Sequence, residues 1–558
     1  MRNWHSLITS QVRKSGLPPL LAIILLLLSF NSSAKRSERL VDTWKPLHYD
    51  VTIKFNDQLS EITSARTEIS ALVLKDNVKT LDLDFGAMLI DSVTLNGQSA
   101  HYEKQPEVLD VELSPAFKNG EKLNITVNYH GRPKDGLILA TDRDGKPSAT
   151  GDNWPNRVHQ WIPCLDHPSA KATVSFTVAA PQREIVIANG RFVNIAGNAA
   201  TSLWRYEETR PIPPYCMVIV VNEGARVDAN EKSLTPLSFY VPQRDRSYAA
   251  KGFSPAAPAV SLFSEMIATY PYEKLGLIIG ATKYGGMENS SAIVFTSTLF
   301  DARPNDKVSV CFGIPTRIEE VVAHEIAHQW FGDSVTESTW SDLWLSEGFA
   351  TYFAGLFVER YDGEDAFRVY MRHAADRYFA YELQRRAPIH DTETTDLNQL
   401  LNPNNYEKGA WVLHMLRKRL GDEAFFKGLR IYYNAHHEAN ATTEDLREAL
   451  EKASGQNLKE FFARWVYGSG HPQYELSWDW KVRTEKSGTL TVTLHQTQAG
   501  EAFLDPVPVL IDIRGFGTSH EVIKPTGKST SQQFSILRQP QSIRIDPDET
   551  LLKEVVSK

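Results

Sequence analysis

The sequence has little cysteine. Only three cysteines, Cys164, Cys216 and Cys311, occur among its 558 residues. At most one intramolecular disulfide can therefore form, and one thiol has to stay unpaired. This count excludes a fold that depends on disulfides. For an exported protein of this size it is more typical of a bacterial envelope than of an animal cell surface.

Apolar runs long enough to cross a membrane are also missing. The run from Leu20 to Leu28 covers about ten residues, short of the ~20 that a spanning helix needs, and no other segment could span. Three basic residues precede this run and the small residues 32–34 follow it. Residues 1–34 are therefore predicted to be a secretory signal peptide. The alternative is an uncleaved segment that anchors the protein in a membrane.

The sequence has no excess of positive charge either. It contains 60 Lys and Arg against 68 Asp and Glu, and removal of residues 1–34 with their three basic side chains takes the formal net charge from −8 to −11. This balance argues against nucleic-acid binding, so no nucleic-acid partner is expected. With 42% hydrophobic and 23% charged residues the composition is that of a globular protein, and the length predicts three or four domains.

Apolar and polar residues alternate near both ends of the chain, which predicts β-strands. The pattern is clearest at Tyr49, Val51, Ile53 and Phe55 and again at Val507, Val509, Ile511 and Ile513. Between these regions the apolar spacing becomes helical after Pro255. We therefore expect an α+β protein with a β-rich domain over residues 40–245, a mainly helical domain over 246–470 and a small β-sandwich over 471–558.

The most informative motif is the run His-Glu-Ile-Ala-His from His324 to His328. Side chains four residues apart lie on one face of a helix, so the two histidines can bind one metal ion. Hydrolytic zinc sites use two histidines and a carboxylate and leave a fourth position for water. Glu347 is the expected third ligand, and Glu325 lies beside the metal without binding it. One Zn²⁺ per chain is the predicted cofactor, which cobalt or manganese could replace in vitro.

The residues around this motif favour a helix. Thr316 and Glu319 have the spacing of a capping box, and Gly332 provides a stop after the second histidine. An alternative interpretation fits the five-residue motif alone: an amphipathic helix whose half-buried histidines bind nothing. Other motifs are needed to decide between the two.

Three further motifs occur in a fixed order around the histidines. Gly-Gly-Met-Glu-Asn stands at residues 285–289, Asn-Tyr-Glu-Lys-Gly at 405–409 and Pro-Cys-Leu-Asp-His-Pro at 163–168. Together with the stretch 322–353 they resemble the gluzincin zinc aminopeptidases, of the aminopeptidase N and leukotriene-epoxide hydrolase type. The resemblance covers roughly residues 46 to 470.

The resemblance implies a fold. It implies a saddle-shaped N-terminal β domain that forms one wall of the substrate cleft, followed by a thermolysin-like, mainly helical catalytic domain. Many family members continue with a large helical domain after a β-sandwich. This sequence stops at Lys558, so no such domain is expected here.

The resemblance also implies the roles of individual residues. Glu325 would act as the general base on the zinc-bound water, and Tyr406 together with the zinc would stabilise the oxyanion. Glu288 would hold the free α-amino group of a peptide substrate, which makes the enzyme an exopeptidase. The substrate-binding loop would consist of Gly285, Gly286, Met287, Glu288 and Asn289. The expected protein is an aminopeptidase exported to the bacterial periplasm or secreted, or else held at the membrane by its N-terminal segment.

Two departures from the family pattern leave alternatives open. The family usually has Glu or Gln nine residues before Pro163, where this sequence has Trp154, and Asp152 is either a second anchor for the amine or a plain turn residue. An epoxide hydrolase would need Asp eight residues before Tyr406, and Asn398 stands there instead, which disfavours that activity because an amide is a weak base. A catalytically silent peptide-binding module is disfavoured by the intact metal and catalytic residues.

Overall fold

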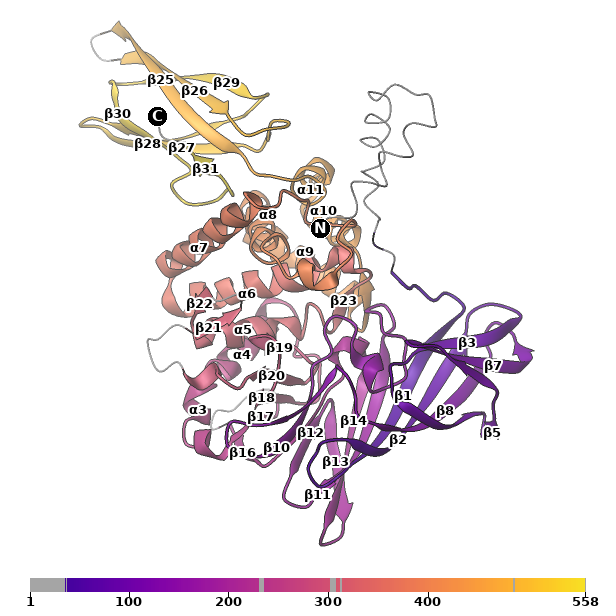
Figure 1. The fold of residues 1–558 in the computed structure, drawn as a ribbon. Coiled ribbons are helices and arrows are strands. Elements are labelled where there is room, and N and C mark those ends of the chain that lie inside the picture. The colour runs from indigo at the N-terminus through magenta and orange to yellow at the C-terminus, as the bar shows by residue number, and fades with distance from the viewer. Residues whose placement is uncertain are drawn as a thin grey trace, which may run out of the picture.

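The computed structural model describes Arg36 and residues 38–229, 235–301, 308–311, 314–484 and 487–556, with only the backbone given for 308–311 and 314–316 (Figure 1). The predicted signal peptide, residues 1–34, lies outside the described residues. No helix in the described ranges is long and apolar enough to cross a membrane.

The N-terminal region forms a large twisted sheet, as its alternating pattern predicts (Figure 1). β1 (Trp44–Phe55) lies in the middle, parallel to β11 (Ala172–Pro181) and antiparallel to β2 (Ile62–Val73). Its inward residues Tyr49, Val51 and Ile53 are fully buried. The remaining strands of this sheet are β13 (Arg191–Gly197), β14 (Thr201–Ile212), β8 (Lys122–Gly131), β4 (Leu89–Leu95) and β5 (Gln98–Ser99).

Two smaller sheets complete this β-rich domain. One consists of β12 (Ile185–Ala188), β15 (Ile219–Asn222), β10 (Pro147–Gly151) and β9 (Leu137–Thr141). The other consists of β3 (Val78–Asp84), β7 (Val108–Phe117) and β6 (Tyr102–Lys104). Residues from all three sheets belong to one apolar core, which continues into the helical domain.

The next sheet has five strands, and it crosses the border that the sequence analysis places at residue 245. Its order is β16 (Gly224–Asp228), β17 (Leu237–Pro242), β18 (Leu275–Gly280), β20 (Ala292–Thr296) and β19 (Gly286–Met287). β19 is the last strand in this order and pairs only with β20 among the described residues. One edge of β19 is therefore left without a neighbouring strand in the described part of the chain.

Most of the helices lie between this sheet and the C-terminal strands (Figure 1). The helices are α3 (Ala249–Gly252), α4 (Ala256–Met266), α5 (Ile318–His328), α6 (Trp344–Asp362), α7 (Glu364–Glu382), α8 (Gly409–Leu420), α9 (Asp422–His436), α10 (Thr443–Ser454) and α11 (Lys459–Trp465). In α6 every residue from Trp344 to Val358 is buried, as in a helix that is apolar all round. α6 therefore forms the centre of the helical domain, and α5 packs against it.

Helix α5 begins differently from the prediction. Its N-cap is Arg317, one residue after the expected Thr316, with extended backbone and no side-chain capping bond. The side chain of Thr316, on which the expected capping box depends, lies outside what the structure describes. The Arg317 side chain instead pairs with Glu320 and Asp362. α10, by contrast, has a complete capping box between Thr442 and Asp445.

The C-terminal residues form a β-sandwich, as predicted. One sheet contains β29 (Ser529–Ile536), β26 (Ser487–Gln496), β25 (Gln473–Thr484) and β31 (Glu554–Val555). The other contains β28 (Gly517–Ile523), β27 (Val507–Ile513) and β30 (Pro540–Ile545). Both sheets contribute to a separate core that includes Val492, Val509 and Ile545.

Candidate active site

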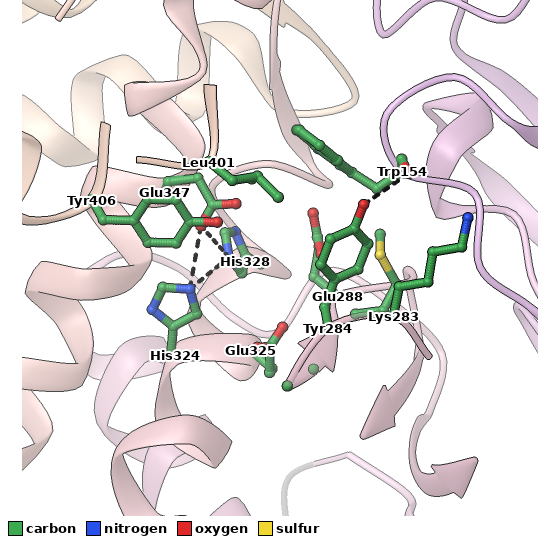
Figure 2. Close-up of a pocket in the computed structure, with 13 residues that line it drawn as sticks. Trp154, Lys283, Tyr284, Glu288, His324, Glu325, His328, Glu347, Leu401 and Tyr406 are labelled. Carbon is green, nitrogen blue, oxygen red and sulfur yellow. Dashed lines mark hydrogen bonds and ion pairs between the residues drawn. The ribbon is translucent and has the colours of Figure 1, made fainter. Parts of the chain in front are cut away.

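Helices α5 and α6 bring the three predicted metal ligands together (Figure 2). His324 and His328 lie on one face of α5, and Glu347 lies in the first turn of α6. The Nε2 atoms of the two histidines are 3.1 Å apart, and each is 3.3 Å from Oε2 of Glu347. The three side chains thus converge on one point.

This triangle fits a zinc ion. At a metal–ligand distance of about 2.0–2.1 Å, two ligands of a tetrahedral site lie about 3.3 Å from each other. The observed separations of 3.1 and 3.3 Å match that spacing. Two imidazoles and a carboxylate are also the donor set of hydrolytic zinc sites.

The ring of His328 is held in the orientation that a metal ligand needs. Its Nδ1 lies 3.2 Å from the carbonyl oxygen of Phe331 and 3.0 Å from Oγ of Ser346. A carbonyl only accepts, so Nδ1 carries a proton whether or not the ring is charged, and Nε2 is the atom left to bind a metal once the metal displaces its proton. Gly332 makes room for this arrangement: with φ +122° it sits so close that an added Cβ would lie 2.4 Å from the Ser346 hydroxyl.

The charges at the site favour a cation. Burial alone lowers the pKa of His328, but the carboxylates of Glu347, Glu288 and Glu325 raise it to about 10. Burial alone raises the pKa of Glu347, but the two histidines lower it to about 2. The field that holds a proton on His328 and keeps Glu347 ionised would also stabilise a divalent metal ion.

Glu325 lies beside the metal ligands and against the Gly285–Met287 segment. Burial, followed by the repulsion from Glu288 and Glu347, raises its pKa well above the usual value, although His328 opposes this. A Cβ on Gly286 would lie 2.3 Å from the carboxyl carbon of Glu325. Only glycine at this position lets strand β19 approach the carboxylate so closely.

Glu288 follows β19 and is buried in the same cavity. Burial and the nearby Glu347 raise its pKa, against the effect of His328, to about 7. The segment is fixed from behind by Gln329, whose Nε2 donates to the carbonyl oxygen of Glu288 at 2.8 Å. Oε1 of Gln329 accepts from the backbone nitrogen of Ser291 at 2.8 Å and from the hydroxyl of Tyr270 at 2.9 Å.

Gln329 was missed by the sequence analysis. It directly follows His328, but its spacing relative to the motif points to no particular chemistry. Its amide connects the metal helix to the substrate-binding loop, and this contact joins residues about 40 positions apart. Only the folded arrangement reveals it.

Tyr406 lies on the other side of the metal ligands from Glu288 (Figure 2), in a π-helical turn over Asn404–Lys408. Its ring is parallel to that of His324, with an interplanar angle of 3° and centroids 6.0 Å apart. The turn approaches α6 at two glycines, because a Cβ on Gly409 would lie 2.9 Å from the Cα of Gly348. These glycines let the segment with Tyr406 reach the helix that carries Glu347.

The three metal ligands, Glu325, Glu288 and Tyr406 line one cavity of about 230 Å³ (Figure 2). Its lining consists of Trp154, Lys283, Tyr284, Gly285, Gly286, Met287, Glu288, His324, Glu325, His328, Glu347, Leu401 and Tyr406. Nine of these thirteen were predicted. Trp154, which the sequence analysis noted only as a departure, and Lys283, Tyr284 and Leu401 were not, although Lys283 and Tyr284 directly precede the Gly-Gly motif.

Three other candidate residues lie outside that lining. Asn289 is fully buried behind the loop, and its amide donates to the carbonyl oxygen of Met287 at 3.3 Å. Asp152 is also fully buried: it pairs with Arg157 at 2.9 Å and accepts from Thr282 at 3.0 Å. Asp152 thus has a structural role, and its carboxylate is not available to bind the amine of a substrate. The amide of Asn398 donates to Asp396 in an exposed turn.

Comparison with known proteins identifies similar sequences along most of the chain. The family described as "Peptidase family M1 domain" matches residues 256–465, and the family described as "Peptidase M1 N-terminal domain" matches residues 45–216. The probable aminopeptidase 2 of Sulfurisphaera tokodaii is 28% identical over 77% of this chain and 55% of that protein. The glutamyl aminopeptidase of Sus scrofa is 27% identical over 84% of this chain and 52% of that protein. The chain thus spans about half the length of these curated relatives.

A solved structure has the same fold. The aminopeptidase A of Legionella pneumophila, crystallised in complex with aspartic acid, superimposes with a TM-score of 0.80 at 20% sequence identity. The match covers 94% of this chain and 61% of that structure. Nearly the whole chain is therefore folded in the same way.

Proposed function

The chain belongs to the peptidase M1 family, and from this premise we propose that it is a zinc-dependent aminopeptidase that hydrolyses the N-terminal residue from peptides. The observation that carries the proposal is the convergence on one buried cavity of a metal-binding triangle, a carboxylate base and a separate carboxylate for the substrate amine. The names of the relatives, which are aminopeptidases, support the same activity.

His324, His328 and Glu347 would hold one zinc ion. When bound, zinc polarises the peptide carbonyl and lowers the pKa of water to about 7. Ser346 and the Phe331 carbonyl keep the ring of His328 in place for this task. Glu347 is ionised without help from a base, because the two histidines lower its pKa to about 2.

Glu325 is the proposed general base. Its carboxylate lines the cavity one residue from the first metal ligand, where it can take a proton from the attacking water and pass it to the leaving amine. Burial raises its affinity for that proton. Gly286 leaves the carboxylate enough room beside β19.

Glu288 is the proposed anchor for the α-ammonium group of the substrate. A buried carboxylate forms a strong charge-assisted bond with an ammonium ion and so fixes which peptide bond reaches the base. The edge of β19 next to it offers backbone groups to an extended peptide. Tyr406, stacked beside His324, is the proposed donor to the oxyanion that forms in the transition state.

We also propose that the protein is exported. The support is the sequence of residues 1–34 alone, which has the charge and apolar run of a signal peptide. A periplasmic or secreted enzyme would then meet peptides outside the cytoplasm. Retention of the segment as a membrane anchor is the alternative.

The test of the proposed activity compares free and N-acetylated peptides. Zinc-loaded full-length protein should release the first residue from a free tripeptide, stop when a chelator removes the metal, and leave the acetylated peptide intact. Removing one partner of a desolvated charge pair costs ~2–5 kcal/mol, so Glu288→Ala should lower kcat/KM on the free peptide by roughly 30-fold to several thousand-fold.

Glu501→Ala is the matched control for that variant, since the Glu501 side chain is 92% exposed in the C-terminal sandwich. It should leave kcat/KM unchanged. Internal cleavage of the acetylated peptide at the rate of the free one would overturn the exopeptidase assignment and make the protein an endopeptidase.

A further inference from the structure

Part of the cavity lining is an uncharged wall that comes from one apolar cluster. Its members are Trp154, Tyr284, Met287 and Leu401, of which Trp154 and Tyr284 lie across the cavity from His324 (Figure 2). We propose that this wall receives the side chain of the first substrate residue, and that it selects large apolar and aromatic side chains over acidic and basic ones. The inference rests on the proposed function and adds the class of substrate to it.

Trp154 is the fixed centre of this wall. It is 2% exposed and lies edge-to-face against Tyr284, at 5.9 Å between ring centroids, and against Trp340, at 5.6 Å. The Tyr284 hydroxyl also donates to the carbonyl oxygen of Trp154 at 3.3 Å. Rings held on two sides form a preorganised surface, so an apolar side chain can bury area against it without ordering it first.

An acidic side chain would find no free cation at this wall among the residues that the structure describes. Lys283 lines the cavity, but its ammonium donates to both carboxylate oxygens of Asp135, at 2.9 and 3.0 Å. Arg157 lies behind the wall and bridges Asp135 and Asp152, at 2.7 and 2.9 Å. An ionised carboxylate would therefore leave water without gaining an ion pair, which is unfavourable.

A basic side chain at the first position would also lack an ion-pair partner in the described lining of the cavity. The cavity lining contains three carboxylates, Glu288, Glu325 and Glu347. The proposed function engages them with the substrate amine, the attacking water and the metal. No fourth carboxylate lines the cavity among the described residues. Lys or Arg at the first position would thus lose hydration without a partner.

The size of the cavity limits it to about one residue. At about 230 Å³ it is smaller than the roughly 300–1,000 Å³ of typical small-molecule sites. A large apolar side chain would bury its surface against four uncharged residues, whereas alanine would reach little of that surface. Full burial of a Leu- or Phe-sized side chain corresponds to a preference of about 10- to 100-fold.

The first experiment measures kcat/KM of the zinc-loaded full-length protein on 4-nitroanilides of Leu, Phe, Met, Ala, Glu and Arg. The expected result is that Leu, Phe and Met exceed Ala by at least about 10-fold and exceed Glu and Arg by at least about 30-fold. Release of Glu or Arg at the rate of Leu or faster would overturn this inference and leave the aminopeptidase activity standing. Release of no residue from any substrate would overturn both.

The second experiment asks whether Trp154 causes the preference. Trp154→Ala should lower the ratio of Phe to Ala activity by about 10-fold, because it removes the largest ring of the wall. Leu401→Ala, at a less buried position, should lower the same ratio by a smaller factor and gives a test if the first variant does not fold. Trp478→Ala is the control, since Trp478 is 37% exposed in the C-terminal sandwich. An unchanged ratio in folded Trp154→Ala and Leu401→Ala would assign the preference elsewhere and overturn the proposal.

Discussion

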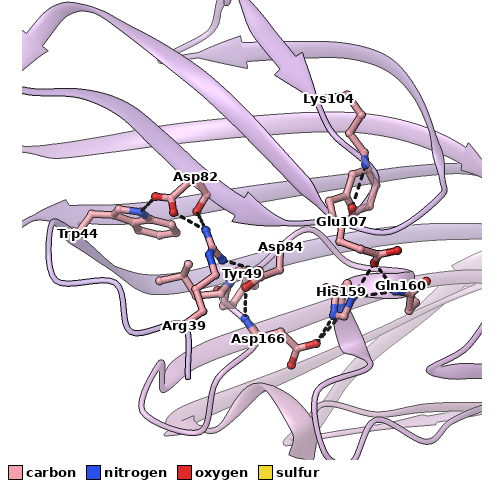
Figure 3. Close-up of polar contacts among 12 residues, drawn as sticks. Arg39, Trp44, Tyr49, Asp82, Asp84, Lys104, Glu107, His159, Gln160 and Asp166 are labelled. Atoms are coloured by element: carbon pink, nitrogen blue, oxygen red, sulfur yellow. Dashed lines mark hydrogen bonds and ion pairs between the residues drawn. The ribbon is translucent and has the colours of Figure 1, made fainter. Parts of the chain in front are cut away.

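Two regions of the molecule place histidine next to carboxylates, and they differ in how far other protein groups compensate the charge of those carboxylates. The first is the site cluster, made of His324, His328, Glu347, Glu288 and Glu325 (Figure 2). The second lies in the N-terminal domain and is called the N-terminal cluster here (Figure 3). Its members are Arg39, Asp82, Asp84, Glu107, His159 and Asp166.

In the N-terminal cluster every carboxylate has a donor from the protein. Arg39 pairs with both Asp82 and Asp84. Asp166 accepts from Nδ1 of His159 at 2.7 Å and from the backbone nitrogen of the same residue at 3.0 Å. Nε2 of His159 lies 3.1 Å from Glu107, which completes the chain of contacts. Each carboxylate of the cluster is thus engaged by a donor, and these contacts tie loops and strands together.

In the site cluster the carboxylates are left with far less compensation. Among the described residues no Lys or Arg forms an ion pair with Glu288, Glu325 or Glu347. The charge partner that the three share is His328. The comparison teaches that histidine beside carboxylate does not by itself indicate a metal site. What distinguishes the metal site is that three donor atoms are spaced for one ion at a point where no Lys or Arg among the described residues pairs with the carboxylates.

The largest expected effect comes from removing a ligand of the site cluster. Glu347→Ala should lose its zinc on dialysis, since two imidazoles alone make a poor site, and activity should fall by about 10⁴-fold or more. Metal analysis together with the nitroanilide assay measures both. The corresponding change in the other cluster, Asp166→Ala, should retain one zinc per chain. Tight zinc binding by Glu347→Ala would place the third ligand elsewhere.

The next effect separates chemistry from metal binding within the site cluster. Glu325→Gln keeps the three ligands and removes the base, so zinc content should stay near one per chain while kcat falls by ~10²- to 10⁴-fold. Glu107→Gln, in the N-terminal cluster, should change neither quantity. Loss of zinc from Glu325→Gln would show that this carboxylate is a ligand and not a base.

Tyr406→Phe should have a smaller effect. It removes one hydrogen-bond donor to the transition state, so kcat should fall by roughly 10²-fold or more with little change in KM, and zinc should be retained. Tyr467→Phe is the control, because Tyr467 lies in the same domain and donates to Glu444 on the surface. Near-normal kcat in Tyr406→Phe would leave its parallel contact with His324 as a packing feature only.

The smallest effect belongs to the N-terminal cluster and concerns stability. Burial alone lowers the pKa of His159, but the bonds to Asp166 and Glu107 raise it to about 9. A pKa raised on folding contributes stability that is complete below the unfolded value of about 6.5 and is lost as the pH rises through about 9.

The free energy of unfolding of the wild type should therefore exceed that of His159→Asn by about 1–2 kcal/mol at pH 6, and the difference should shrink by pH 9.5. Urea denaturation at the two pH values measures it, while kcat/KM at pH 7 should be equal for the two proteins. A difference that does not depend on pH would mean that His159 contributes by packing and not by charge.

The sequence was sufficient for the parts of the site that local geometry determines. Helical periodicity alone places His324 and His328 on one face, and the period-two pattern of residues 49–55 alone predicts a strand with one buried face. Glu347 was expected from the donor set of hydrolytic zinc sites, whereas Glu288 and Tyr406 needed the resemblance to a family, because no local rule connects them to the histidines. The structure brings all three to the same cavity.

The remaining features depend on contacts between distant segments. Trp154 meets Tyr284 about 130 residues later, and Gln329 meets Glu288 across two elements, so neither contact leaves a periodic signal. Strands β16 and β17 fall within the β-rich domain expected over residues 40–245, but a region of strands does not say which strand each one pairs with, and these two join the sheet that carries β19. Helix α5 takes Arg317 as its N-cap, and the ion pairs of Arg317 with Glu320 and with Asp362, 45 residues later, lie outside the pattern of a capping box.

The most direct test of the account is the position of the metal. Anomalous scattering at the zinc edge from crystals of the full-length protein should show one strong peak per chain, about 2.0–2.2 Å from Nε2 of His324, Nε2 of His328 and a carboxylate oxygen of Glu347. No such peak should occur at the N-terminal cluster, whose carboxylates are already engaged by Arg39 and His159. A zinc peak at His159 and Asp166, or the absence of one between helices α5 and α6 in active protein, would contradict the account.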